Sequence, residues 1–119
     1  MRKQWINENE LRAALLPLHA GNQPQLQLFE EIDSTNAEAL RQLQALDHSQ
    51  RCEAKAFIAR RQSAGRGRRG RVWSSESNAG LYLSLVRGFE LEAQALQGLS
   101  LVVGLAAQAA LTQLGAQEV

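Results

Sequence analysis

The stretch from Gln25 to Leu40 reads QLQLFEEIDSTNAEAL and changes its pattern half-way along. Residues 25–32 alternate between apolar and polar, which is typical of a half-buried strand. Thr35-Asn-Ala-Glu38 then forms a capping box, in which a hydroxyl and a carboxylate three residues later satisfy backbone N–H groups at the start of a helix. The stretch therefore predicts a strand followed directly by a helix.

Four further elements are expected on either side of this stretch. With the first two, they give the order helix, strand, helix, strand, loop, strand, helix, which predicts an α/β or α+β domain. The four are a short helix capped by Asn7 and ended near Pro17, strands at Ala54–Arg60 and Leu81–Val86, and a helix at Leu99–Leu114 that Gly115 would stop.

The helix expected at Leu99–Leu114 has the clearest pattern. Its apolar residues recur at helical spacing and predict one wide apolar face, with Ser100, Gln108 and other polar or small residues on the opposite side. Its most apolar part, Leu99–Leu111, is too short to span a bilayer. Because no secretory signal is visible at the N-terminus either, we expect a soluble cytoplasmic protein without a membrane partner.

Composition narrows the class of protein. A chain of 119 residues with 45% hydrophobic residues can form one domain with a core. The single cysteine, Cys52, excludes an internal disulfide framework. His19 and His48 stand alone, so we expect no metal site, and no Ser–His–Asp arrangement can be recognised.

Residues 62–73 read QSAGRGRRGRVW and carry an unusual local charge. The chain holds 13 basic and 12 acidic residues, and six arginines with no acid fall within residues 60–71. The rest of the chain is therefore acidic, which argues against a generally basic nucleic-acid-binding surface and indicates a local anion site. Ser63–Gly80 has no regular period and is expected to be one long loop, of a length that is usually functional or disordered.

The residue types in this segment suit an organic anion with a ring. Glycines let the backbone approach a ligand, and arginines donate forked hydrogen bonds to carboxylate or phosphate. Gln62 can bind a neutral polar group and Trp73 can stack on a flat ring. Residues 65–70 also fit the dinucleotide pattern G-x-G-x-x-G, but no helix is expected to start within it. An arginine-rich RNA-binding loop and a solvated charged loop remain open alternatives.

Four pieces of the chain resemble biotin protein ligases in their order and spacing. They are Asp33-Ser-Thr-Asn36, the segment Gln62–Trp73, Leu81-Tyr-Leu-Ser84 and Gly98-Leu-Ser-Leu-Val-Val-Gly104. The resemblance covers about residues 25–119 and implies a mixed sheet flanked by helices, as the N-terminal half of that catalytic domain. Residues 1–24 would then be a segment with a short helix and no helix-turn-helix domain.

The resemblance implies an activity with two substrates. Biotin would be activated with ATP, accompanied by Mg²⁺, to biotinyl-5′-AMP, and then transferred to a lysine of the biotin carboxyl carrier protein of acetyl-CoA carboxylase. Ser34 and Thr35 would reach the ureido ring of biotin, although both could simply cap the helix, and a helix N-terminus serves either purpose. Arg69 and Arg71 could equally be solvated. The residues that would bind biotin or the adenylate are Ser34, Thr35, Asn36, Gln62, Gly65, Arg66, Gly67, Arg68 and Trp73.

The chain departs from the family pattern in one respect that concerns catalysis. The family's Lys-Trp-Pro-Asn block, whose lysine contacts the reacting groups, is expected beyond Val119, and neither Lys3 nor Lys55 stands in that context. We therefore expect no catalytic residue within this chain, a truncated ligase without a repressor domain, no specific DNA binding, and no activity of the chain alone. A biotin- or nucleotide-binding module without turnover, or an RNA-binding protein, is the alternative.

Overall fold

The computed structural model describes residues 6–15, 23–47, 53–74 and 80–118. Contacts within the chain divide it into two compact units, Met1–Gly88 and Phe89–Val119. The first unit holds the sheet and two of the helices, and the second holds the C-terminal helix. Each unit is described by itself below.

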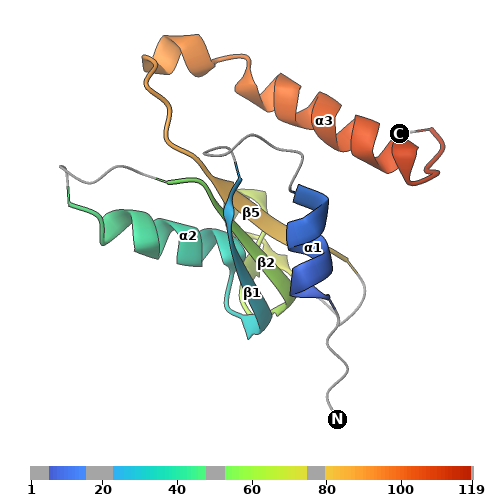
Figure 1. Ribbon diagram of the computed structural model, residues 1–119. Coiled ribbons are helices and arrows are strands. Elements are labelled where there is room, and N and C mark those ends of the chain that lie inside the picture. The colour runs from blue at the N-terminus through green and yellow to red at the C-terminus, as the bar shows by residue number, and fades with distance from the viewer. Residues whose placement is uncertain (1–5, 16–22, 48–52, 75–79, 119) are drawn as a thin grey trace. The chain divides into compact units, whose positions relative to one another are not determined.

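The first unit is built on a mixed three-stranded sheet with the order β1-β2-β5 (Figure 1). Strand β1 (Gln25–Ile32) runs parallel to β2 (Lys55–Gln62), and β2 pairs antiparallel with β5 (Tyr82–Val86). The strands lie close to their predicted positions, and β2 extends two residues further than expected, to Gln62. The predicted mixed sheet with helices is confirmed.

The core is centred on the middle strand, β2. Four consecutive residues of this strand, Ala56 to Ala59, are buried, and the Phe57 side chain has no exposed surface. Because successive side chains of a strand point to opposite faces, a buried run of this kind means that both faces of the sheet are covered at its centre.

Helix α2 (Thr35–Gln44) covers one face of the sheet. The amides of Gln42 and Gln27 exchange hydrogen bonds of 2.8 and 3.1 Å, which ties the helix to β1. Helix α1 (Glu8–Leu15) lies against the other face, where it borders a hollow with Leu26. Asn7 caps α1 as predicted, because its side-chain oxygen accepts hydrogen bonds from the first backbone N–H groups; the expected end at Pro17 lies outside the described residues.

The cap of α2 is one residue earlier than predicted. Ser34, with extended backbone angles, is the N-cap, and its hydroxyl accepts a hydrogen bond from the backbone N–H of Ala37 at 3.2 Å. Thr35, the expected cap, is the first helical residue, and its hydroxyl is turned inward to Gln62 instead. Glu38, the expected partner of the box, pairs with Arg41 and Gln42.

The prediction of an irregular loop over 63–80 is wrong for its first part. Residues 65–73 form a small hairpin in which β3 (Gly65–Arg66) pairs antiparallel with β4 (Val72–Trp73). The hairpin turns because Arg69 and Gly70 both take positive φ angles, of 59° and 71°, and the N–H of Gly67 then donates to the carbonyl of Arg71 at 2.7 Å. Residues 75–79 lie outside the described parts.

The second unit consists of a 3₁₀ turn, η2 (Ala93–Leu96), and helix α3 (Leu99–Gln113). Gly115 ends α3 as predicted: its φ is +94°, and the N–H groups of Gly115 and Ala116 donate to the carbonyls of Thr112 and Leu111, each at 3.0 Å. This pair of bonds is a Schellman motif, which satisfies the last carbonyl groups of a helix.

The predicted division of α3 into an apolar and a polar side is wrong. Leu101 and Leu105, which are 73% and 65% exposed, project on the side expected to be polar. Leu101 lies one turn after Gln97, and Leu105 lies one turn before Gln108. No residue of α3 is buried. Large apolar side chains therefore project on both sides of α3, and on one side they lie among the polar residues Ser100, Gln108 and Thr112.

The length of this apolar region also needs a correction. By length and composition alone, the 21-residue run Ala93–Gln113 could cross a membrane, because its most apolar stretch of 18 residues has a mean hydropathy of 1.5. Within it, α3 itself has 15 residues, fewer than the roughly 20 that a spanning helix needs. The buried core helix of a water-soluble protein meets the same criterion, so the run by itself assigns no membrane location.

We expect the 119-residue chain to self-associate through α3, because contiguous exposed apolar surface favours association. Replacing Leu101 and Leu105 by Glu should lower the average mass in sedimentation experiments at micromolar concentration. Ser100→Glu with Thr112→Glu is the matched control, since it adds the same charge to α3 without removing an apolar side chain. A monomeric unsubstituted chain, or equal masses for the two variants, would contradict this expectation.

Candidate functional site

The candidate site lies where the parallel strands β1 and β2 end. Ile32 and Gln62, the last residues of the two strands, are partners in the register. The pairing continues in the connecting segments, because the N–H of Ser63 donates to Ile32 at 2.9 Å and that of Ala64 donates to Asp33 at 2.8 Å. The start of α2 and the start of the hairpin are thereby held side by side, at the carboxyl edge where ligands of α/β sheets commonly bind.

A cavity of about 260 Å³ opens at this edge, and we call it the polar cavity. Two separate parts of the sequence supply its walls, the start of α2 and the end of β2 with the residues that follow. Four of the nine predicted binding residues line it. Its lining residues are Ser34, Asn36, Ala37, Leu40, Gln62 and Arg66.

The roles considered for Ser34 are compatible in the structure. Its side chain is 7% exposed and caps α2 by accepting from Ala37, yet Ser34 also lines the polar cavity. As an acceptor in the cap, the Ser34 oxygen keeps its hydroxyl hydrogen for another partner. Asn36, the second residue of α2, is exposed and lines the same cavity, and its side-chain amide can both donate and accept hydrogen bonds.

Thr35 does not line the polar cavity, and it lies behind Gln62. Its side chain is 3% exposed, and the Oε1 atom of Gln62 accepts from the backbone N–H of Thr35 at 2.8 Å and from its hydroxyl at 3.1 Å. The same hydroxyl is 2.8 Å from that of Ser84 on β5. Sequence reasoning gave Ser84 no role, although its place in Leu81–Ser84, a polar residue in an otherwise apolar strand, was the available signal.

Gly65 is required by close packing between the hairpin and Gln62. A Cβ atom at this position would stand 3.0 Å from the Trp73 carbonyl oxygen and 3.1 Å from Nε2 of Gln62. Any larger residue would therefore displace the hairpin or the Gln62 amide. The predicted ligand-binding role of Gly65 remains a prediction.

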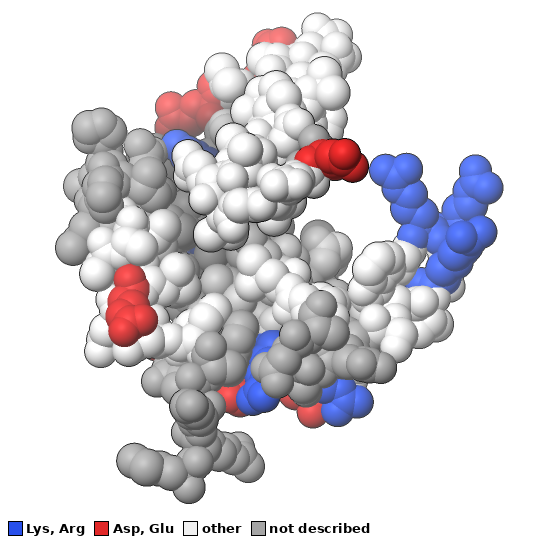
Figure 2. Space-filling view, turned by 90° about the vertical axis from the view of Figure 1, so that its right-hand side faces the viewer, with Lys and Arg blue, Asp and Glu red and all other residues white. Residues whose placement is uncertain are grey.

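A second cavity, of about 410 Å³, lies on the hairpin itself, and we call it the arginine cavity. The predicted residues Gly67, Arg68 and Trp73 line it, and the Trp73 ring is part of a side chain that is 59% exposed. Basic side chains project from one side of the molecule in Figure 2. The arrangement suits an anion attached to a flat ring. The lining residues are Gly67, Arg68, Arg69, Arg71, Val72 and Trp73.

An ion-pair network that sequence reasoning missed stabilises the start of α2. The guanidinium of Arg41 donates to both carboxylate oxygens of Asp33, each at 2.8 Å, and also to Glu38 at 2.8 Å. The hydrogen bond from Arg41 is the largest cause that holds the pKa of Asp33 well below its ordinary range. Hydrogen bonds from Gln42 and then Arg41 lower the pKa of Glu38, and both acids raise that of Arg41.

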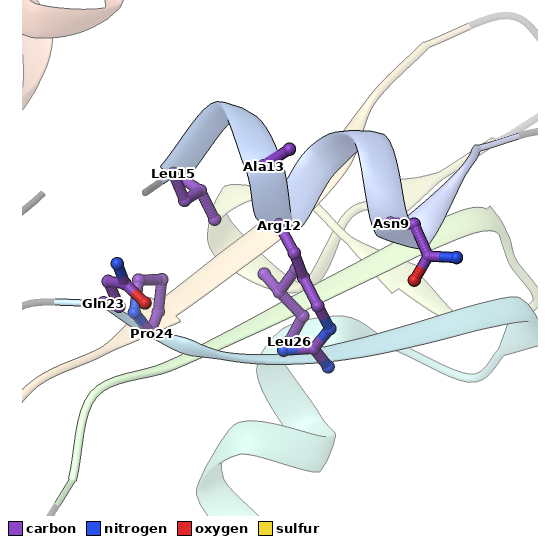
Figure 3. A pocket seen from close by; sticks show the side chains of 7 residues that line it. All are labelled: Asn9, Arg12, Ala13, Leu15, Gln23, Pro24 and Leu26. Atoms are coloured by element: carbon purple, nitrogen blue, oxygen red, sulfur yellow. The ribbon is translucent and has the colours of Figure 1, made fainter. Parts of the chain in front are cut away.

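A hollow of about 360 Å³ lies away from the predicted residues, between α1 and the start of β1 (Figure 3). Four side chains of α1 line it together with Gln23, Pro24 and Leu26. The charged one, Arg12, forms an ion pair with Glu8 at 2.6 Å. None of the residues predicted to bind biotin or the adenylate contributes to this hollow.

Metal ligands and lysines are sparse around the site. In the parts of the chain that the structure describes, no three His, Cys, Asp or Glu side chains gather as they would around a metal ion. Lys55 is on β2 and donates to Gln42 of α2 at 3.1 Å, while Lys3, His19 and His48 lie outside the described residues.

Comparison with known protein families identifies the family of this chain. The family model of the biotin/lipoate A/B protein ligase family matches residues 28–119, which include both cavities. The chain belongs to this family. The match begins within β1 and therefore includes all nine residues predicted from the sequence to bind biotin or the adenylate.

Curated relatives within this family are longer than the chain. The bifunctional ligase/repressor BirA of Escherichia coli is 44% identical over 88 residues, which are 74% of this chain and 26% of BirA. The biotin--[acetyl-CoA-carboxylase] ligase of Mycobacterium tuberculosis is 37% identical over 103 residues, 85% of this chain and 37% of that protein. The chain thus spans about a quarter to a third of these relatives. No solved structure matches it significantly.

The Asp33–Arg41 pair predicts a pH dependence. Because the pKa of Asp33 is lowered in the folded chain, the pair stabilises the fold at pH values above the ordinary 3.8, and this contribution is lost as the pH falls below it. Arg41→Met should raise the pKa of Asp33 towards 3.8, measured by an NMR titration of its carboxyl carbon. Arg12→Met, which removes another exposed ion pair, should leave it unchanged. An unchanged titration in Arg41→Met would contradict the assignment.

Proposed function

We propose that this chain forms the biotin- and adenylate-binding part of a biotin protein ligase. One observation carries the proposal: Ser34 and Asn36, from one family motif, and Gln62 and Arg66, from another, line a single cavity although 26 or more positions separate the two groups in the sequence. Neutral donors and acceptors on one wall suit a neutral ureido ring, and an arginine at the edge suits the carboxylate.

The proposed reaction joins two anions. An oxygen of the biotin carboxylate attacks the α-phosphorus of ATP, a new P–O bond forms, and the bond to pyrophosphate breaks. The two anions repel each other unless cations lie beside them, and Arg66 and Arg68 stand at the polar and arginine cavities respectively. Mg²⁺ is proposed as the companion of ATP.

The product, biotinyl-5′-AMP, is a mixed anhydride that water hydrolyses. The amine of an acceptor lysine then attacks its acyl carbon, an amide forms and AMP leaves. The hairpin 65–73 contributes to both cavities, so a ligand in both would be covered by its backbone and by Trp73, which excludes water. The acceptor is proposed to be the biotin carboxyl carrier protein of acetyl-CoA carboxylase, in the cytoplasm.

Catalysis requires a residue that ligand binding does not, namely the lysine that contacts the reacting groups in the family pattern. The lysine expected from the family pattern is not among the residues of either cavity, and Lys55 is engaged with Gln42. The 119-residue chain is therefore proposed to bind biotin and the adenylate without forming biotinyl-5′-AMP by itself. DNA binding is not expected from either cavity.

Titration calorimetry of the chain with biotin and with ATP tests the proposal. Gln62→Ala should weaken biotin binding by about tenfold or more, because a half-buried amide with several partners is lost. Gln44→Ala, on the exposed side of α2, is the matched control. Weak binding of polyanions should persist in Gln62→Ala, since an uncharged side chain releases no counterions. Equal biotin affinity in both variants, or sequence-selective RNA binding without biotin binding, would overturn the proposal.

The arginines of the arginine cavity are expected to slow the dissociation of biotinyl-5′-AMP. Arg68→Gly removes one cationic fork from this cavity, and a charged hydrogen bond of this kind is worth about 1.5–3 kcal/mol. We expect added biotinyl-5′-AMP to dissociate about ten times faster or more from this variant, as measured by stopped-flow fluorescence of Trp73 and the other tryptophan. Arg12→Gly, in the hollow beside α1, serves as the control. Equal retention by both variants would exclude a sealing role for the hairpin.

A further inference from the structure

The orientation of the Gln62 amide can be deduced from its partners. The backbone N–H of Thr35 can only donate, so the Gln62 atom 2.8 Å from it must be the amide oxygen, Oε1. The amide nitrogen is then the other end of the group, on the side of Gly65, where a Cβ atom would stand 3.1 Å away from it. The orientation thus follows from the chemistry of the partner atoms.

The direction of the hydroxyl chain follows in the same way. The hydroxyl of Thr35 is 3.1 Å from the same Oε1 atom, and because a carbonyl oxygen cannot donate, the Thr35 hydroxyl must. Its single hydrogen is then used, so the 2.8 Å contact between Thr35 and Ser84 must be donated by Ser84. The hydrogen bonds therefore run from Ser84 to Thr35 to the Gln62 oxygen.

These hydrogen bonds from Ser84 through Thr35 to Gln62, which we call the relay, are largely shielded from solvent. Thr35 is 3% exposed, and Ser84 is half-buried on β5 opposite the fully buried Phe57 of β2. Hydrogen bonds of this kind strengthen one another in a poorly solvated environment. Two donors on Oε1 also make the reversed amide unfavourable, because its NH₂ group would then face the backbone N–H of Thr35.

We propose that Ser84 is a positioning residue which, through Thr35, holds Gln62 so that the polar cavity is offered the amide nitrogen and selects a ligand with a hydrogen-bond acceptor there. Ser84 does not line the cavity and acts only through Gln62, which does. The inference rests on the proposed function in one point: the acceptor is identified with the ureido carbonyl oxygen of biotin.

The positioning is tested without a ligand by NMR of the ¹⁵N-labelled 119-residue chain. Ser84→Ala leaves the Thr35 hydroxyl without its donor and free to rotate away from Gln62, so the side-chain amide resonances of Gln62 should shift and broaden. Tyr82→Phe, which removes a hydroxyl from the same face of β5, should leave these resonances in place. Unchanged Gln62 resonances in Ser84→Ala would overturn the inference.

Ligand selection is tested with biotin and 2-iminobiotin, which carries an imino group in place of the ring carbonyl oxygen. Ser84→Ala should bind biotin about 3- to 10-fold more weakly and prefer it less over 2-iminobiotin. Combined with Gln62→Ala, it should cause no further loss of affinity, because it acts through that residue. An undiminished preference in Ser84→Ala, or a full additional loss in the double variant, would overturn the ligand-selecting role.

A second pair of variants covers the case in which Ser84→Ala fails to fold. Thr35→Ser keeps the relay hydroxyl and should retain the Gln62 resonances and the preference for biotin, whereas Thr35→Val, of similar shape, should lose both. Equal behaviour of these two variants would contradict the relay. If the unsubstituted chain binds no biotin, the proposed function and the ligand-selecting role fall together, and the amide resonances alone still decide the positioning role.

Discussion

The parallel pairing of β1 with β2 determines where the residues of the candidate site lie. Parallel strands end at the same edge of a sheet, and the register that pairs Ile32 with Gln62 makes these two strands end together. The chain that leaves β1 enters α2 at once, and the chain that leaves β2 enters the hairpin at once. The polar start of α2 and the residues Gln62 and Arg66 thereby become the walls of one cavity.

The regular elements were predictable from sequence because their signals are local. The alternation over Gln25–Ile32 and the glycine at 115 have a meaning that does not depend on distant residues. The cap of α2 was misplaced because Ser34 and Thr35 are both good caps, and what separates them is a tertiary contact between Thr35 and Gln62. The hairpin 65–73 was missed because strands of two residues are too short to show a period.

Those candidate residues whose type by itself indicates a binding function could be named from the sequence. Glycines, arginines, Gln62 and Trp73 are unusual enough together to indicate an anion site, and family resemblance added Ser34 and Asn36. The supporting residues could not be found in this way. The contact of Thr35 with Ser84 spans 49 positions, and Arg41 reaches back eight positions to Asp33, so neither pair forms a motif. Such roles become visible only when the folded chain brings the partners together.

The relay has a consequence for the order in which the chain becomes competent to bind. Ser34, Thr35 and Gln62 are brought together by β1, α2 and β2, but the donor that completes the relay comes from β5, the last strand of the sheet to leave a ribosome. A partly folded chain in which β5 has not docked has the same cavity-lining residues, but the Thr35 hydroxyl that helps to orient Gln62 then lacks its donor. A ligand that needs the oriented amide would bind the complete sheet more tightly than a sheet without β5, so by mass action it would shift the equilibrium towards the docked β5. Such a ligand would stabilise a strand whose Ser84 does not line the cavity.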